Sequence, residues 1–246
     1  MTELAGRTVL VTGASKGIGA ETVRALGAAG AHVIAHYNQD PPGAQAAVES
    51  LPAERVHLVQ ADLAYPPAAR QLWKEAMQWR GQVDVVVNNA AALAESPLEA
   101  SDEDWDAAWA LTYAVNVAGP MALTREAVRY FRSRGGGVLI AMSSWAAQRG
   151  SGSPDLAAYS ASKAALKAAT QTLARAHAAE GLLCYVIAPG IVRTRMWRSP
   201  TPALAVSRAL GERWPWGAGS RPPRSPTWWS SWLPARVATS AAPRST

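Results

Sequence analysis

The feature that most constrains this fold is a series of short apolar runs, rich in valine and isoleucine, spaced along the first three quarters of the chain. The runs lie at residues 7–13, 32–37, 56–63, 83–90, 137–144 and 182–189. They lack the polar alternation of strands with one face in water, so we expect strands buried on both faces of a parallel sheet. Segments rich in alanine, leucine and charge separate them, and several end in glycine, as helices do. The sequence therefore predicts an α/β fold, a doubly wound parallel β-sheet with helices on both faces.

The composition sets the size and broad class of the protein. A chain of 246 residues, 49% of them hydrophobic, is long enough for one substantial domain and short for two. No apolar run approaches the ~20 residues that cross a bilayer. The first residues lack the basic end and apolar stretch of a signal peptide, so we expect a cytoplasmic protein with no membrane contact. The single cysteine, Cys184, excludes an internal disulfide and offers no metal cluster, so we expect no metal.

A glycine-rich turn follows the first apolar run. In "TGASKGIG" the glycines at 13, 17 and 19 fall between the first strand and the first helix. There the pyrophosphate of a dinucleotide can approach bare backbone and the positive end of a helix. The spacing is G-x3-G-x-G, and alone it is also compatible with a turn that needs glycine only for close packing.

A tyrosine and a lysine lie four positions apart in "YSASK", at the start of a helical segment. Residues at i and i+4 share a helix face, so the ammonium of Lys163 can lie near the phenol of Tyr159. A free tyrosine titrates near pH ~10, and a neighbouring cation favours the phenolate. The pair therefore predicts a tyrosine that exchanges protons with a substrate oxygen.

Together these motifs resemble the short-chain dehydrogenase/reductase family of the ordinary single-domain type. The matching landmarks are "TGASKGIG", "ADL" at 61–63, "NNA" at 88–90, "VNVAG" at 115–119, "SS" at 143–144, "YSASK" at 159–163 and "PGIVRT" at 189–194. The resemblance implies one Rossmann-like, dinucleotide-binding catalytic domain over residues 1–210. It also implies hydride transfer between a nicotinamide cofactor and a small-molecule carbonyl or alcohol.

The resemblance assigns four catalytic residues. Tyr159 would be the general acid or base, and Lys163 would hold the nicotinamide ribose and lower the pKa of Tyr159. Ser144 would hydrogen-bond the substrate oxygen, and Asn116 would anchor a water that relays protons to Lys163. Ser144 precedes Tyr159 by 15 positions, about two more than the family's usual spacing, so Ser143 stays an alternative. Asn116 could instead satisfy helix backbone.

The resemblance also implies a set of cofactor-binding residues. Asp62 would meet the adenine, Asn88 would line the cofactor cleft, and Thr194 would reach the nicotinamide carboxamide. The full set is Gly13, Ser15, Lys16, Gly17, Ile18, Gly19, Tyr37, Asn38, Asp62, Leu63, Asn88, Asn89, Ala90, Tyr159, Lys163, Pro189, Gly190, Ile191 and Thr194.

The end of the second strand bears on the choice between NADP(H) and NAD(H). Members that use NAD commonly have an acid there, which grips the ribose hydroxyls. In this chain the position falls on Tyr37, which carries no charge to repel a 2′-phosphate, and Lys16 offers a cation nearby. The sequence therefore favours NADP(H) over NAD(H). Asp40 is the counter-argument, because a bulge could swing it back toward the ribose.

Residues 211–246 form an atypical tail rich in tryptophan, proline and arginine. Residues 181–246 carry nine arginines and one acid, whereas residues 1–180 carry 15 basic and 17 acidic residues. The net charge of +6 is thus +8 from the last part and −2 from the rest. Such a tail could bind nucleic acid or an anionic membrane, but six prolines interrupt any amphipathic helix and no RNA-binding motif is present. We expect no nucleic-acid partner.

The coding frame offers another explanation of the tail. Tryptophan has one codon, so Trp228, Trp229 and Ser230 read TGG TGG TCN when the serine uses its four-fold codon box. Reading from one nucleotide upstream forces two valines there, and Trp232–Leu233 with a CTN leucine forces alanine. Across residues 225–234 the shifted frame permits "VADVVVFLAS", the apolar segment that the family would show at this distance from its end. Our hypothesis is a frameshift that begins within residues 211–224. It is either natural or the result of an error in the determined sequence.

A frameshift has consequences for the fold and the function. The last strand of the sheet would be missing or altered. A homo-oligomer is possible for such a chain, but the altered C-terminus makes it doubtful. The alternative function is then a catalytically impaired protein of the reductase fold that binds a dinucleotide or a partner.

Sequencing the gene through codons 205–246 tests the hypothesis. We expect the neighbouring frame to encode "VADVVVFLAS" or a close variant, followed by "YISG" opposite residues 239–242. An unshifted frame in independent clones, with no family-like sequence beside it, contradicts the hypothesis.

Overall fold

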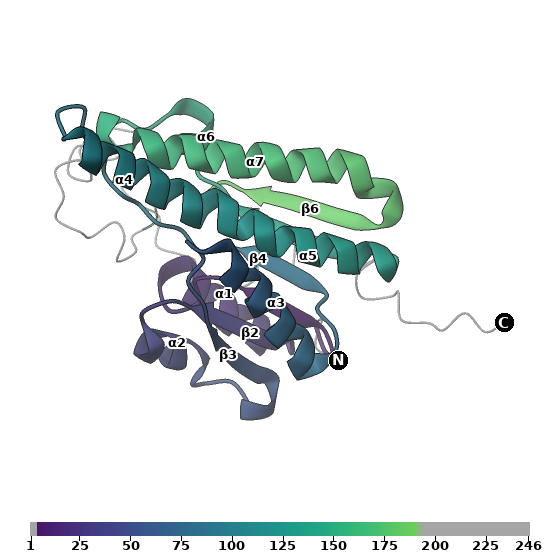
Figure 1. The fold of residues 1–246 in the computed structure, drawn as a ribbon. Helices are drawn as coiled ribbons and strands as arrows, with labels where there is room; N and C mark the ends of the chain where they lie inside the picture. Colours follow the sequence, from purple (N-terminus) through teal and green to yellow (C-terminus); the bar gives the residue numbers. More distant parts are fainter. Residues whose placement is uncertain (1–3, 191, 193–246) are drawn as a thin grey trace.

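The sheet of this protein has six parallel strands in the order β3-β2-β1-β4-β5-β6 (Figure 1). The structure is a computed structural model and describes residues 4–190 and 192. The strands are β1 (Thr8–Val11), β2 (His32–Tyr37), β3 (Val56–Gln60), β4 (Val85–Asn88), β5 (Gly137–Met142) and β6 (Leu182–Ile187). Each apolar run of the sequence contains one of these strands, so the predicted doubly wound sheet is confirmed.

Helices connect the strands, as predicted from the segments rich in alanine, leucine and charge between the apolar runs. The α-helices are α1 (Gly17–Ala28), α2 (Pro41–Val48), α3 (Pro66–Arg80), α4 (Asp102–Tyr113), α5 (Gly119–Ser133), α6 (Ala146–Arg149) and α7 (Ala157–His177). Short turns of other helix types are η1 (Ala53–Arg55), η2 (Ala114–Ala118), η3 (Pro154–Leu156) and η4 (Ala178–Glu180). Among them η2 is a π-helical turn that joins α4 to α5 without a break.

Two hydrophobic cores lie on the two faces of the sheet, because successive strand residues point to opposite sides. Val9 and Val11 of β1 belong to the core that α1 covers, where Val23 is fully buried. Leu10, between them, belongs to the opposite core with Leu72 of α3 and neighbours from α5. Burial on both faces explains why the strands read as continuous apolar runs rather than as alternating ones.

The chain reverses its direction of travel across the sheet beside β1. After β1 it moves outward to β2 and β3, and after β4 it moves outward the other way to β5 and β6. Such a switch point opens a crevice at the carboxyl ends of the strands, where ligands of open α/β sheets bind. The expectations for the last strand and for the tail at 211–246 lie outside the described residues. Within the described part of the chain, no helix is long and apolar enough to span a bilayer.

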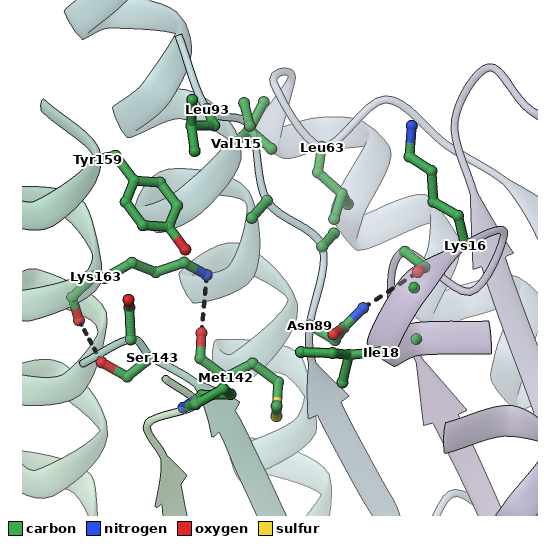
Figure 2. A pocket seen from close by; sticks show the side chains of 18 of the residues that line it. Lys16, Ile18, Leu63, Asn89, Leu93, Val115, Met142, Ser143, Tyr159 and Lys163 are labelled. Carbon is green, nitrogen blue, oxygen red and sulfur yellow. Dashed lines mark hydrogen bonds between the residues drawn. The ribbon is translucent and has the colours of Figure 1, made fainter. Parts of the chain in front are cut away.

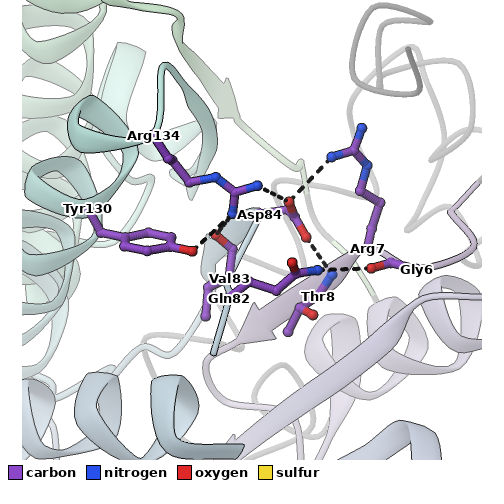
Figure 3. A network of polar contacts seen from close by, with 8 residues as sticks. All are labelled: Gly6, Arg7, Thr8, Gln82, Val83, Asp84, Tyr130 and Arg134. Carbon is purple, nitrogen blue, oxygen red and sulfur yellow. Dashed lines mark hydrogen bonds and ion pairs between the residues drawn. The ribbon is translucent and has the colours of Figure 1, made fainter. Parts of the chain in front are cut away.

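An ionic network fixes the opposite, amino-terminal edge of the sheet (Figure 3). The carboxylate of Asp84, which is only 5% exposed, accepts the backbone amide of Thr8 at 2.8 Å. It also accepts from Arg7 at 3.3 Å and from Arg134 at 3.1 Å. Arg134 in turn donates to the hydroxyl of Tyr130 at 3.1 Å. One buried carboxylate therefore ties β1, β4 and the end of α5 together.

We predict that Asp84→Ala lowers the free energy of unfolding by about 3 kcal/mol, because it leaves a buried amide and two arginines without their shared acceptor. Urea unfolding followed by circular dichroism measures this loss. Glu126→Ala is the control, since Glu126 pairs with Arg125 and Arg129 at 3.7 and 3.9 Å on the helix surface. That variant should lose less than about 0.5 kcal/mol. Equal losses in the two variants would contradict a special role for Asp84.

Candidate active site

A cleft of about 800 Å³ opens at the carboxyl ends of the strands, at the switch point (Figure 2). Its walls come from the turn after β1, the loops after β2, β3, β4 and β5, and the first turns of α7. The glycine turn and the tyrosine–lysine pair, far apart in sequence, both face this one cleft.

The glycines of the turn after β1 are required by its geometry. Gly13 adopts φ +69° and Gly17 adopts φ +57°, in the left-handed region that favours glycine. A Cβ on Gly19 would collide with the carbonyl oxygen of Gly13 and lie 2.6 Å from the amide nitrogen of Asn89. The turn therefore holds bare backbone against the first turn of α1, and Gly13, Gly17 and Gly19 all line the cleft.

Thr12 and Asn89 bind the turn after β1 to the loop after β4. The Thr12 hydroxyl accepts the amides of Asn89 at 2.9 Å and Ala90 at 3.0 Å. The Asn89 side chain donates back to the carbonyl oxygens of Thr12 at 2.8 Å and Gly13 at 3.1 Å. These reciprocal bonds fix the floor of the cleft at the switch point.

His36 of β2 holds the glycine turn from the other side. Its Nδ1 accepts the amide of Gly13 at 3.1 Å, and its Nε2 lies 2.9 Å from the carbonyl oxygen of Ala61. Its backbone carbonyl accepts the amide of Ala14 at 2.8 Å. Burial of the ring, which is 2% exposed, lowers its pKa from 6.5 to about 4. Sequence reasoning missed this residue, because a histidine inside an apolar strand carries no motif.

Tyr159 and Lys163 lie on the same face of α7, one turn apart. The Lys163 amine lies 5.8 Å from the centre of the Tyr159 ring and donates to the carbonyl oxygen of Met142 at 2.8 Å. Figure 2 shows the Tyr159 hydroxyl and the Lys163 amine directed toward the same part of the cleft. The spacing in the sequence predicted this pairing on one helix face.

Burial shifts the pKa values of both groups against their charged forms. It lowers the pKa of Lys163 from 10.5 to about 8. Burial also raises the pKa of Tyr159, and a hydrogen bond with the Ser144 side chain opposes that rise. The sequence predicted a Tyr159 pKa lowered by Lys163, whereas in this structure desolvation outweighs the opposing effect and the phenol stays protonated.

The two serines after β5 have different surroundings. Ser143 donates its hydroxyl to the backbone carbonyl of Lys163 at 3.0 Å, and so fastens β5 to α7. Ser144 bonds to the Tyr159 phenol and accepts the amide of Ala146 at 3.2 Å. Ser144 is thus the serine whose hydroxyl lies beside the tyrosine, which supports its choice over Ser143.

Asn116 is fully buried in the π-helical turn η2. Its side chain accepts the amide of Ala92 at 2.8 Å and donates to the Ala92 carbonyl oxygen at 2.9 Å. It also donates to the Ser162 hydroxyl at 2.9 Å, and Ser162 donates to the backbone carbonyl of Tyr159 at 2.7 Å. The side chain therefore braces the loop after β4 and the first turn of α7. π-Helical turns of this kind are frequent at functional sites.

The two ends of the cleft differ in polarity. The end near α1 and β2 is lined by Lys16, Asn38, Gln39, Asp40 and Asp62. Asp40 also caps α2, because its carboxylate accepts the amide of Gly43 at 2.9 Å. Beyond Tyr159 the described lining is mainly apolar, with Leu93, Leu111, Val115, Trp145 and Leu156. Leu111 and Trp145 are 48% and 39% exposed, so this end presents large apolar side chains to a ligand.

Most of the residues predicted from the sequence line this cleft. They are Gly13, Ser15, Lys16, Gly17, Ile18, Gly19, Asn38, Asp62, Leu63, Asn89, Ala90, Ser144, Tyr159, Lys163, Pro189 and Gly190. Ile191 and Thr194 lie outside the described residues.

Three other predicted residues do not line the cleft. Asn88 points into the core and donates to the Thr124 hydroxyl at 2.8 Å. Tyr37 also faces away, since its neighbours His36 and Asn38 take the lining positions. Asn116 braces the site from behind. For Asn88 and Tyr37 the physical reason is the two-residue period of a strand, which sends adjacent side chains to opposite sides.

The cleft meets the requirements of a nicotinamide dinucleotide. It combines a glycine turn that a Cβ would fill, the start of α1, and a buried lysine beside a tyrosine. Among the described residues, no three His, Cys, Asp or Glu side chains gather as metal ligands.

Comparison with known proteins agrees with this arrangement. The family model described as short chain dehydrogenase matches residues 7–204. A 3beta-hydroxysteroid dehydrogenase of Eggerthella lenta is 37% identical over 201 residues, which cover 78% of this chain and 73% of that protein. A hydroxynaphthalene reductase of Aspergillus fumigatus is 36% identical over 198 residues, 79% of this chain and 70% of that protein.

Solved structures show the same fold. A 3-oxoacyl (acyl-carrier-protein) reductase of Agrobacterium tumefaciens, with NADP bound, matches with a TM-score of 0.71 and 30% identity. That match covers 80% of this chain and 74% of the other. A 3-ketoacyl-(acyl-carrier-protein) reductase of Brucella melitensis matches over 96% of this chain and 93% of its own, with a TM-score of 0.78. At 23% identity this last match shows the fold alone.

We predict that Lys163→Met raises the free energy of unfolding at pH 7 by about 2 kcal/mol. The lowered pKa of Lys163 means that burying its charged amine costs about 3 kcal/mol, a cost that the variant avoids. The variant also loses the hydrogen bond to Met142, which lowers this gain in stability by about 1 kcal/mol. Between pH 8 and pH 10.5 the unfolded chain binds more protons at this lysine than the folded chain, so the stability of the parent protein rises with pH. The advantage of the variant is therefore largest below pH 8 and fades toward pH 10.5.

Urea unfolding of both proteins across this pH range measures the effect. Lys167→Met, the same substitution one turn further along α7 at a half-buried position, is the control and should show no such pH-dependent gain. A Lys163→Met protein less stable than the parent at pH 7 would contradict the prediction.

Proposed function

Because this chain belongs to the short-chain dehydrogenase family, we propose that it is an NAD(P)-dependent oxidoreductase that interconverts a carbonyl compound and an alcohol. The observation that carries the proposal is the convergence of Tyr159 and Lys163 on the same cleft as the glycine turn.

A bound nicotinamide dinucleotide supplies or accepts the hydride in this chemistry. The glycine turn and the start of α1 would hold its pyrophosphate, and Asp62 and Leu63 would border its adenine end. Lys163 would hold the ribose beside the nicotinamide. Pro189 and Gly190 close the described part of the cleft near β5.

Tyr159 manages the proton. Because burial raises its pKa, the phenol is protonated at neutral pH and can donate to a carbonyl oxygen. Ser144, which bonds to the phenol, orients it and offers a second hydrogen bond to the same oxygen. Lys163, with a pKa of about 8, can exchange protons near neutrality and restores the phenol after each turnover.

The apolar end of the cleft supports a neutral substrate of substantial apolar area. Charged side chains are absent from the described lining beyond Tyr159, and Leu111 and Trp145 there are partly exposed. Burying such side chains against an apolar ligand is favourable by about 25 cal/mol per Å². The named relatives include a hydroxysteroid dehydrogenase and a hydroxynaphthalene reductase, so a ketone or alcohol on a ring system is the substrate class we propose.

NADP(H) is the proposed cofactor. The strand β2 ends without an acid facing the cleft, since Asn38 and not Tyr37 takes the lining position. Asp40 is engaged in capping α2, which weakens the argument for NAD(H). Lys16 lines the same end of the cleft and supplies a cation for a 2′-phosphate.

The alternative is a protein of the same fold that binds a dinucleotide or a partner without turnover. The atypical composition of residues 211–246 favours it. The intact tyrosine, lysine and serine favour the enzyme.

We predict that Tyr159→Phe lowers kcat for ketone reduction by 10²–10⁴-fold, roughly the contribution of a general acid, and leaves the Kd for NADPH within about threefold. The assay is NADPH oxidation with a neutral bicyclic ketone, beside a keto acid of similar size that should react more slowly. Fluorescence titration gives the Kd values for NADPH and NADH, and NADPH should bind more tightly. Tyr185→Phe, on β6 outside the cleft, is the control.

Two results would count against the enzyme. Unchanged reductase activity in Tyr159→Phe would overturn the role of the tyrosine. Saturable NADPH binding by the parent protein, with no reduction of any carbonyl compound, would favour the alternative.

A further inference from the structure

His36 stands out among the residues that the proposed mechanism does not use. It is a polar side chain, 2% exposed, whose two ring nitrogens both have partners. Those partners belong to two different loops of the cleft, the turn after β1 and the loop after β3. Any buried imidazole needs hydrogen-bond partners, and here those partners join two loops of the cleft.

The partners of the ring decide its chemical form. A backbone amide can only donate, so Nδ1 must accept from Gly13, and a carbonyl oxygen can only accept, so Nε2 must carry the hydrogen toward Ala61. The ring is therefore neutral with its hydrogen on Nε2. Its lowered pKa agrees, since burial disfavours the charged form. A charged ring would place an N–H against the Gly13 amide and break the contact.

The Gly13 peptide group is held at both ends. His36 accepts its amide, and the Asn89 side chain donates to its carbonyl oxygen at 3.1 Å. Gly13 adopts φ +69° between these two anchors. The next amide, that of Ala14, donates to the backbone carbonyl of His36 at 2.8 Å. Two successive amides of the turn are thus turned toward β2, which leaves the amides at the start of α1 to face a phosphate.

We infer that His36 is a positioning residue for the dinucleotide, which sets the orientation of the Gly13 peptide and thereby the path of the glycine turn. The inference rests on the proposed binding of a dinucleotide. The essential contact is the one from Nδ1 to Gly13, and the contact from Nε2 to Ala61 fixes the ring plane so that Nδ1 points at the turn.

Two substitutions separate the two contacts. In His36→Asn the side-chain oxygen takes the place of Nδ1 and can still accept the Gly13 amide, but the side chain is too short to reach Ala61. In His36→Gln the terminal amide can reach Ala61, but no acceptor lies at the place of Nδ1. If His36 served only to stabilise the fold, each variant would lose affinity for NADPH in proportion to its loss of stability.

The experiment measures the Kd for NADPH by fluorescence titration, the melting temperature, and the exchange rate of the Gly13 amide by NMR without ligand. We expect His36→Gln to weaken NADPH binding about tenfold, as loss of one buried hydrogen bond implies, and to speed Gly13 exchange at least as much. His36→Asn should stay within about threefold of the parent protein in both measurements. The KM for NADPH should rise in His36→Gln with little change in kcat.

Matched controls are His57→Asn and His57→Gln. His57 lies on β3, stacks on Trp79 at 5.3 Å between ring centres, and does not line the cleft. Neither control should change the Kd.

Equal Kd values in the two His36 variants, or losses that follow only their melting temperatures, would overturn the inference. An unchanged exchange rate of the Gly13 amide in His36→Gln, measured without ligand, would also overturn the inference. A parent protein that binds neither NADPH nor NADH would instead contradict the proposed function, and the exchange measurement would still decide whether His36 holds the turn.

Discussion

The hydrogen bonds that hold the chain as it leaves β1 decide where every other group of the cleft lies. Gly13 has to turn through a left-handed conformation so that bare backbone reaches the cleft, and such a turn has little packing of its own. Hydrogen bonds hold it instead: His36 accepts the Gly13 amide, Asn89 donates to the Gly13 carbonyl oxygen, and the Thr12 hydroxyl accepts the Asn89 amide. Because these partners come from β2 and from the end of β4, the turn is fixed only when the sheet has formed. The geometry of the binding site therefore depends directly on the order of the strands in the sheet.

Helix α7 places a buried charge against the end of β5, and burial of this charge works against the stability of the fold. Lys163 is 2% exposed, and the Met142 carbonyl oxygen is the acceptor that its amine reaches. A carbonyl dipole repays only part of the cost of removing an ammonium from water. The buried Asp84 at the other edge of the sheet differs, because two arginines and an amide surround it. Poorly compensated charges of this kind cluster at functional sites, whereas a fully compensated one such as Asp84 is typical of structural networks.

Much of this arrangement could be predicted from the sequence, and the parts that could not have a common physical cause. The strands followed from their continuous apolar character, and the pairing of Tyr159 with Lys163 followed from helix periodicity. Predictions at strand ends were less secure, because a shift of one residue sends a side chain to the other side. For that reason the predicted Tyr37 and Asn88 lie away from the cleft, while their neighbours His36 and Asn89 face it. His36 carried no motif, since its importance comes from a partner 23 positions away in the chain.

The contacts that build the cleft also bear on the unusual end of the sequence. In the described part of the chain, the side-chain hydrogen bonds that involve Gly13, Asn116 and Lys163 go to partners between His36 and Ser162, all of which precede residue 190. A change of reading frame after residue 211 would leave all of these contacts encoded as they stand. The glycine turn at the polar end of the cleft would then keep its hydrogen-bond partners. Dinucleotide binding would therefore survive such a change, and a chain that binds the cofactor without turnover would agree with it.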